Sequence, residues 1–336
     1  MKIKTLITLI RDGRFSMMLK LSKTGESFYR ACFISAGLRE GIYDRLRQGP
    51  VSLETLNRDL GYKLASRILE AWLELGVKLG ELRHGPDGYV LGSRLSRKIA
   101  ESYYDPQRAF VEEIVHLHHT LLTETPSRMK QGNRFTWSDT DGKLIARSSR
   151  VLEPFIFDTM DQWVPRTGEC DLLEVGCGSG IYIRQACQLN PLLKAVGLEM
   201  QPEVAAFAGI NIREWRLDDR VTIETGNILN YQTGLKFDLV TLHNNIYYFQ
   251  EDTRVTLAHN LKSFLKPGGR LIITTGCRNG GIVMQVLNLW SVMTEGAGAL
   301  PLPEELYAHL VQAGFHKIKM KNLMVGEKYY LFIAES

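Results

Sequence analysis

Apolar runs alternate with stretches of helical periodicity throughout the second half of the chain. From Cys170 onward the runs predict strands near 171–175, 194–199, 221–225, 237–242, 270–275, 316–323 and 328–334. Strands that alternate with helices are typical of a Rossmann-like, doubly wound α/β sheet. The last two runs are joined at Val325-Gly326-Glu327, so we expect a seven-stranded sheet that ends in an antiparallel hairpin.

The first hundred residues predict a small, mainly helical domain. Apolar residues recur near helical spacing from Phe28 to Leu46, a second helix begins after Ser52 as its N-cap, and a third covers about Leu64 to Lys78. A short hairpin is predicted around residues 84–87. Three helices followed by a hairpin is the order of a winged helix.

A winged helix can bind DNA, and its third helix would then be the recognition helix. It carries Arg67 beside Glu70 and Glu74 and is otherwise apolar. The two glutamates would repel DNA phosphates, and the apolar side chains offer few hydrogen bonds to base edges. A DNA-binding regulator with a ligand-sensing domain is therefore the less favoured alternative.

Residues 101–165 connect the two parts of the chain. Ala109 to Thr123 is helical in pattern and carries His116, His118 and His119. His116 and His119 share a helical face, but no carboxylate or cysteine completes a recognisable metal-ligand spacing. We predict exposed or interface histidines and no metal site.

Composition narrows the functional classes. The chain has 336 residues, enough for two domains of about 150 residues each, and a formal net charge of +4 with interspersed charges. Neither nucleic acid nor a membrane surface is predicted as a partner. Five cysteines without a CxxC pair favour reduced thiols in the cytoplasm. The apolar run from Leu6 to Ile10 is too short for an export signal or a spanning helix.

The stretch DLLEVGCGSG, residues 171–180, carries the most specific signal. An apolar strand ends there in Gly176, Gly178 and Gly180, which predict a positive-φ turn into a helix near Ile181. A dinucleotide fingerprint would have its third glycine one position later. Glu199 ends the next apolar run, where a carboxylate can accept two hydrogen bonds from a ribose diol.

These residues resemble the class I S-adenosylmethionine-dependent methyltransferases. The glycine motif, Glu199, the stretch Gly226-Asn227-Ile228, the strand opening at Phe237 and the turn 265–271 are similar to that family's motifs and follow the same order. The family more often has Asp where this chain has Asn227. The resemblance implies S-adenosylmethionine as cofactor, bound by Glu174, Gly176, Gly178, Gly180, Glu199, Met200, Asn227, Ile228 and His243.

The resemblance also implies an organisation. Residues 1–100 are similar to the winged-helix-like dimerisation domain of small-molecule O-methyltransferases, 101–165 would line the acceptor site, and 166–336 would bind the cofactor. The resemblance therefore implies a cytoplasmic homodimer that acts on a small molecule in secondary metabolism. The resemblance leaves open whether one of the three connector histidines contacts the substrate.

The loop after the fourth strand departs from the O-methyltransferase pattern. Their general-base histidine lies in a His-Asp-Trp run, which falls here on Tyr247-Tyr248-Phe249. His243 lies at the strand end, where it is either a base or a packed residue. Tyr247, with an ordinary pKa near 10, would be a poor base, and Asn244 cannot take a proton.

We therefore expect His243, Tyr247 and Asn244 at the reacting centre. Alignment of the acceptor is favoured over general-base catalysis, because a sulfonium carries its own leaving group. An amine, an enolisable carbon or an acidic oxygen would suit such a site, so O, N and C acceptors stay open. The alternative is a SAM-binding protein of this fold that performs other SAM chemistry or none.

Overall fold

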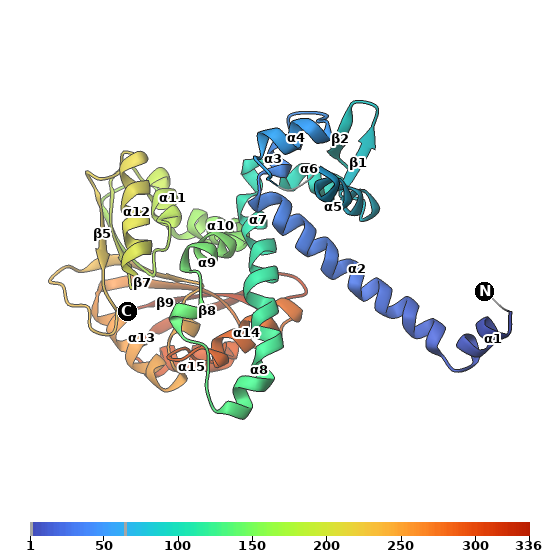
Figure 1. Cartoon of the computed structure of the whole chain (residues 1–336). Coiled ribbons are helices and arrows are strands. Elements are labelled where there is room, and N and C mark those ends of the chain that lie inside the picture. Colours follow the sequence, from blue (N-terminus) through green and yellow to red (C-terminus); the bar gives the residue numbers. More distant parts are fainter. Residues whose placement is uncertain (1–2, 64–65) are drawn as a thin grey trace. The chain divides into compact units, whose positions relative to one another are not determined.

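The computed structural model describes residues 3–63 and 66–336. They form two compact units, the first ending at Leu117 and the second running from His118 to Ser336 (Figure 1).

The first unit is mainly helical and carries one small hairpin. Its elements are α1 (Ile3–Arg11), α2 (Arg14–Arg39), α3 (Ile42–Leu46), α4 (Leu53–Asp59), α5 (Ser66–Lys78), β1 (Leu82–Gly85), β2 (Gly88–Leu91), α6 (Arg94–Ile99) and α7 (Asp105–Glu113). Ser52 caps α4 as expected, because its Oγ accepts the Thr55 N–H at 3.2 Å. The predicted third helix is present as α5, while Leu64 and Ala65 lie outside the described residues.

The core of this unit sits between α2, α3, α5 and the hairpin. Phe33 of α2 stacks on Trp72 of α5 with ring centroids 4.0 Å apart. The amino-terminal half of α2 is different, because Met17, Met18 and Leu21 are all exposed. The long helix therefore has one end in a core and one end whose apolar side chains are exposed in the described part of this unit.

The predicted connector helix is interrupted. A π-helical turn, Ile114–His118, separates α7 from α8 (His119–Gln131). The Nε2 of His116 lies 3.3 Å from the Ser35 Oγ and 3.0 Å from the Arg39 guanidinium. Burial and then that guanidinium lower the pKa of His116, so its ring is a neutral acceptor. In the described ranges no cluster of three metal-ligating side chains forms.

The second unit is built around a seven-stranded sheet. Its strands are β3 (Cys170–Val175), β4 (Leu193–Glu199), β5 (Val221–Thr225), β6 (Phe237–His243), β7 (Leu265–Gly276), β8 (His316–Asn322) and β9 (Tyr329–Glu335), in the order β5-β4-β3-β6-β7-β9-β8. β9 is antiparallel to both of its neighbours, and the other pairs are parallel. The predicted sheet and its terminal hairpin are confirmed.

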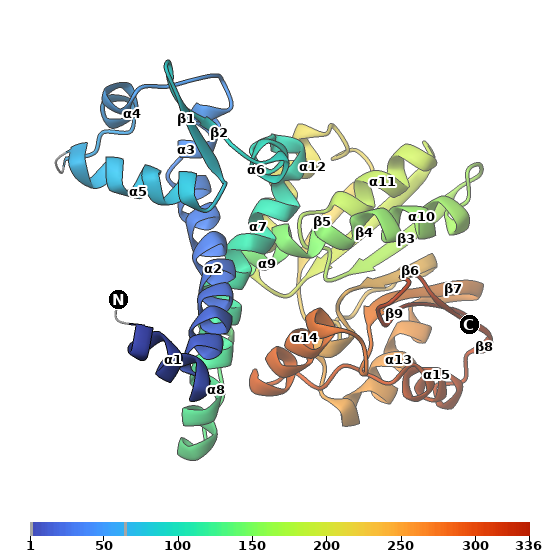
Figure 2. The same ribbon diagram turned by 90° about the vertical axis from the view of Figure 1, so that its right-hand side faces the viewer.

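Helices cover both faces of this sheet (Figure 2). One core contains buried residues of α10 (Glu153–Trp163), α11 (Ile181–Leu189) and α12 (Pro202–Glu214). The other contains buried residues of α13 (Arg254–Ser263), α14 (Ile282–Met293) and α15 (Pro303–Gln312). α9 (Gly142–Ser148) precedes α10. Across residues 3–63 and 66–336, no helix is long and apolar enough to cross a membrane.

Candidate functional site

The glycine turn has the backbone that the sequence predicts. Gly176, Gly178 and Gly180 have φ values of 68°, 55° and 77°, and α11 begins at the next residue, Ile181. A Cβ on Gly176 would approach the Asn245 side-chain nitrogen to 1.7 Å. Glycine is therefore required at position 176 by both its conformation and its surroundings.

Glu199 is held at the end of β4 by main-chain donors. Its Oε2 accepts the Gly178 N–H and its Oε1 accepts the Gln201 N–H, each at 3.1 Å. A carboxylate offers about four acceptor positions, so both oxygens keep capacity for a further donor. The two turns that follow β3 and β4 are thus tied to one carboxylate that still faces a cavity.

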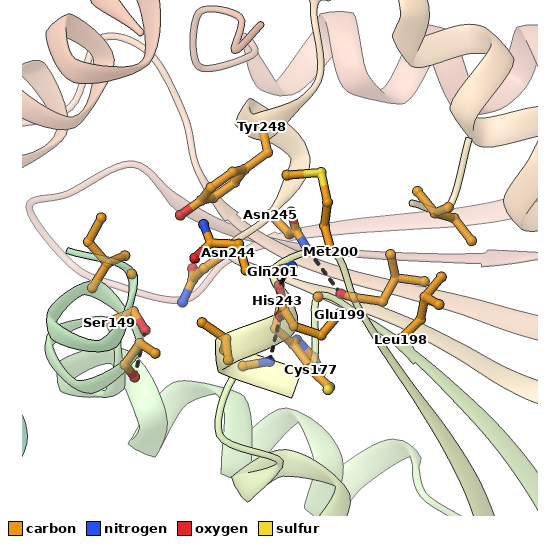
Figure 3. A pocket seen from close by; sticks show the side chains of 18 of the residues that line it. Ser149, Cys177, Leu198, Glu199, Met200, Gln201, His243, Asn244, Asn245 and Tyr248 are labelled. Atoms are coloured by element: carbon orange, nitrogen blue, oxygen red, sulfur yellow. Dashed lines mark hydrogen bonds between the residues drawn. The ribbon is translucent and has the colours of Figure 1, made fainter. Parts of the chain in front are cut away.

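The cavity has a volume of about 430 Å³ and lies at the carboxyl ends of the parallel strands. In the view of Figure 3, Ser149 and Glu199 stand on opposite sides, with His243, Asn244 and Tyr248 between them. The predicted residues that line it are Gly176, Gly178, Glu199, Met200, Asn227, Ile228, His243, Asn244 and Tyr247. This is the edge where ligands of open α/β sheets gather.

Two predicted residues lie beside the cavity without lining it. Gly180 is the N-cap of α11, packed near Ile212. Glu174 is 1% exposed, and neither of its oxygens has a hydrogen-bond partner in the part of the chain that the structure describes. Burial raises the pKa of Glu174 well above 4.5, because a buried carboxylate without partners favours its neutral form.

His243 is buried at the carboxyl end of β6. Its Nδ1 lies 2.8 Å from the Thr274 Oγ1, its ring meets the Tyr182 ring edge-on, and its Nε2 has no partner among residues 3–63 and 66–336. Burial lowers the pKa of His243 to about 3. The ring is therefore neutral over the physiological range and can offer hydrogen bonds more readily than it can hold a proton.

The two asparagines after β6, Asn244 and Asn245, form different hydrogen bonds. Asn244 adopts φ 52°, a left-handed conformation that few non-glycine residues take, and its N–H donates to the Thr274 carbonyl at 2.8 Å. Asn245 donates its amide to the Val175 carbonyl at 3.1 Å and so closes β6 onto the glycine turn. Both side chains line the cavity.

Four aromatic rings form a second wall of the cavity, here named the aromatic cluster: Trp137, Tyr247, Tyr248 and Trp290. Trp137 stacks on Tyr248 with centroids 5.4 Å apart, and Tyr248 stacks on Tyr247 at 5.2 Å. Trp290 meets both tyrosines edge-on. The cavity thus has a polar half at the glycine turn and an apolar half at these rings.

Sequence reasoning missed the cation of this cavity. Arg150 lines it, and the Arg150 Nε lies 2.8 Å from the Glu153 carboxylate. Arg150 and Glu199 are the charged side chains among the described lining residues. The connector was expected to line the acceptor site. Several of its residues, from Trp137 to Arg150, line this cavity, whereas the three connector histidines are absent from the described lining.

Comparisons with known proteins agree with this geometry. A protein-family model described as "Methyltransferase domain" matches residues 173–271. Demethylspheroidene O-methyltransferase of Cereibacter sphaeroides is 23% identical over 187 residues, 54% of this chain and 49% of that enzyme. The chain thus spans about half the length of the curated relatives it matches.

Solved structures resemble nearly the whole chain. The mitomycin 7-O-methyltransferase MmcR matches with a TM-score of 0.78 at 17% identity, over 97% of this chain and all of that one (100%). Human N-acetylserotonin methyltransferase in complex with SAM matches with a TM-score of 0.75 at 15% identity, over 95% and 97%. The predicted class I methyltransferase fold, with its amino-terminal helical domain, is therefore confirmed.

Proposed function

We propose that this chain binds S-adenosylmethionine in the cavity and transfers its methyl group to a small-molecule acceptor. The observation that carries the proposal is Glu199, a carboxylate fixed by two N–H donors with free acceptor capacity beside a bare glycine turn. The two hydroxyl groups of a ribose can donate the hydrogen bonds that this carboxylate can still accept.

The other residues fit the remaining parts of the cofactor. Asn227 and Ile228 line the cavity where an adenine would lie, and the Asn227 Oδ1 already accepts the Leu229 N–H, which fixes the side chain. Arg150 supplies the positive charge that a methionyl carboxylate requires. Gly176 and Gly178 leave main chain bare for close approach.

The chain's own groups would act by alignment. When bound, the cofactor supplies a methyl group on a sulfonium that is its own leaving group. The aromatic cluster would hold the acceptor and exclude water, and His243 and Asn244 would orient its reacting atom by hydrogen bonds. Because its pKa is lowered to about 3, His243 is a weak base, which favours acceptors that are nucleophilic already, such as amines, enolates or acidic hydroxyls.

The experiment has two stages. Calorimetry with S-adenosylhomocysteine should show one binding site per chain, and incubation with S-adenosylmethionine and a panel of amines, phenols and enolisable ketones should give a product one methyl group heavier. No binding of either cofactor form would overturn the cofactor assignment. Tight binding without a methylated product across the panel would favour the alternative, a SAM-binding protein with other chemistry or none. The absence of a histidine from the usual base position, which is occupied by Tyr247-Tyr248-Phe249, supports that alternative.

Homodimerisation is the second part of the proposal. Exposed apolar side chains gather at the start of the chain and favour an apolar partner over water. They are Ile7, Ile10, Phe15, Met17, Met18, Leu19 and Leu21. On α5, in contrast, Glu70 and Glu74 are exposed, which supports a dimerisation domain over a DNA-binding one. The reduced cysteines support a cytoplasmic site of action.

Light scattering tests the dimer directly. The full chain should have twice the mass of one chain, and Met18→Asp combined with Leu21→Asp should give monomers. The matched control is Lys20→Asp with Lys23→Asp on the same helix, which changes charge without removing apolar surface. A monomeric parent, or a salt-sensitive shift with duplex DNA, would reverse the assignment of this domain.

A further inference from the structure

Arg254 is a buried charge that the proposed chemistry does not use. It is the first residue of α13 and is 2% exposed, among the largest fully buried side chains. Removing a guanidinium from water is costly unless its donors are satisfied. The contacts of Arg254 therefore show what the fold gains by keeping it there.

Its guanidinium joins two loops through their carbonyl groups. Nε and Nη2 donate to the Phe249 carbonyl at 3.2 and 3.1 Å, and Nη2 donates to the Ala299 carbonyl at 2.5 Å. Phe249 belongs to the loop after β6, residues 244–251, and Ala299 to the loop after α14, residues 294–300. We name these the β6 loop and the α14 loop.

Two further bonds tie the same loops together. The Gly298 N–H donates to the Tyr247 carbonyl at 3.1 Å, and the Ala299 N–H donates to the Glu251 carboxylate at 3.0 Å. The approach is close, because a Cβ on Gly298 would lie 2.7 Å from the Phe249 oxygen and 3.0 Å from the Arg254 Nη2. Backbone meets backbone here only because position 298 has no side chain.

Both loops carry or adjoin the aromatic cluster. Tyr247 and Tyr248 are on the β6 loop, and Trp290 is in the last turn of α14, directly before the α14 loop. The α14 loop also reaches the third side of the cluster, because Gly296 lines the cavity and lies near the Trp137 indole nitrogen. The contact between the two loops thus joins the segment that carries the two tyrosines to the segment that follows Trp290 and reaches Trp137.

We propose that Arg254 is a positioning residue for the apolar half of the cavity. By binding the Phe249 and Ala299 carbonyls it holds the β6 loop against the α14 loop and fixes the aromatic cluster in the arrangement that receives the acceptor. The role of the cluster in acceptor binding rests on the proposed function; the coupling of the two loops to Arg254 does not.

Arg254 stays charged in this role. Burial lowers its pKa to about 10, with the nearby Glu251 and Glu305 opposing the shift, so the group remains protonated at pH 7. A lysine at this position would keep the charge but would have one nitrogen where the guanidinium spans two carbonyls. Charge alone should therefore not restore the arrangement.

The first experiment requires neither cofactor nor acceptor. The full chain is labelled with 5-fluorotryptophan, and its fluorine NMR signals are assigned by tryptophan-to-phenylalanine variants. In Arg254→Met the signals of Trp137 and Trp290 should shift and broaden, while the signal of Trp163, in α10, should stay unchanged. Arg254→Lys should resemble Arg254→Met more than the parent.

The matched control is Arg220→Met. Arg220 also donates to main-chain carbonyls, including Pro191 at 2.8 Å and Cys187 at 3.2 Å, but it does so at the amino-terminal ends of β4 and β5. This variant should lose stability and keep the Trp137 and Trp290 signals. Gly298→Ala is the second test, because its Cβ pushes the loops apart while Arg254 is kept.

The second experiment separates the two halves of the cavity. In Arg254→Met and Gly298→Ala, S-adenosylhomocysteine affinity should stay within about twofold of the parent, and the KM of an acceptor found in the panel should rise by about tenfold or more. Unmoved Trp137 and Trp290 signals, equal changes in Arg220→Met, or full rescue by lysine would overturn the proposal. Absence of methyl transfer in the parent would refute the proposed function and leave the fluorine result to decide this one.

Discussion

The two ends of strands β3, β6 and β7 hold their polar side chains in opposite ways. At the amino-terminal ends, the Lys266 Nζ lies 2.8 Å from both Asp171 and Asp238, and Asp238 also accepts the Asp171 N–H at 2.8 Å. All three side chains are more than a third exposed. Each charge is paired, and water can reach each of them.

At the carboxyl ends the polar groups are buried and incomplete. Glu174 and Thr241 are register partners on β3 and β6, and neither side chain finds a hydrogen bond in the described structure. His243 is incomplete at its Nε2 as well. Buried polar atoms without partners lower the stability of the folded chain. The carboxyl ends of these strands therefore carry a destabilisation that the amino-terminal ends do not.

The difference separates stability from function along the same three strands. Paired, exposed charges give a modest stabilisation and require no ligand. Of the orphaned buried groups, His243 lines the cavity, so a ligand or water can complete its hydrogen bonds, whereas Glu174 and Thr241 lie behind the described lining. The comparison predicts that substitutions at one end change unfolding alone, and that substitutions at the other change binding, chemistry or pH dependence.

Glu174→Gln should give the largest effect, and it should appear as a change in the pH dependence of stability. The folded chain holds a proton on Glu174 that the unfolded chain releases above about pH 4.5, so this stabilisation is present at low pH and is lost as pH rises. The slope is at most about 1.4 kcal/mol per pH unit and holds only while the folded chain keeps the proton. In urea unfolding, the parent should therefore lose stability relative to Glu174→Gln as pH rises above about 4.5.

The control for that experiment is Glu169→Gln, because Glu169 is exposed directly before β3. Its unfolding free energy should follow the parent at every pH. Parallel curves for the parent and Glu174→Gln would mean that Glu174 is ionised in the folded chain. The contrast between the two ends of the sheet would then be weaker than the burial implies.

Glu199→Ala should weaken S-adenosylhomocysteine binding by about 1 to 3 kcal/mol, because ribose hydroxyls lose a charge-assisted acceptor. Calorimetry should show a Kd about five- to 150-fold higher. Glu199→Gln, which keeps one acceptor oxygen, should fall between the two. Equal affinities in the parent and the alanine variant would contradict the assignment of the ribose.

Much of the fold could be predicted because its strands are apolar runs bounded by turns. β5 occurs at the predicted residues, and the helix after Gly180 begins where it was expected. β7 begins at Leu265, earlier than predicted, because Leu265 pairs with Phe237 before a register shift at the Pro-Gly-Gly turn. A turn motif inside a paired strand gives no such signal in the sequence.

The polar half of the site was predictable and the apolar half was not. Gly176, Gly178 and Glu199 belong to one local strand–turn–helix pattern, so their spacing carries their role. Arg150 and Trp290 line the same cavity only because the fold places them there, and neither lies in a motif. Arg254 follows two acidic residues and has the pattern of a solvated helix start, although it is buried.

His243 should show no general-base signature. Because burial lowers its pKa to about 3, its ring stays neutral from pH 5 to 9, and the pH–rate profile should follow the acceptor's own ionisation. His243→Asn should lower turnover by about tenfold or less, whereas loss of a base costs about 10²- to 10⁴-fold. An inflection near pH 6.5 that vanishes in the variant would make His243 a base.

The smallest effect is expected at the opposite end of the sheet, in Lys266→Met. Its two carboxylate partners hold three strand starts together, but all three groups are partly exposed, so the loss should be about 0.5 to 1 kcal/mol of unfolding free energy. The difference should shrink in 1 M salt, where screening acts within about 3 Å. Lys194→Met, at an exposed position of β4, serves as the control and should change stability less. S-Adenosylhomocysteine affinity should be unchanged in both variants, and a weaker affinity in Lys266→Met would show that the two ends of the sheet are coupled.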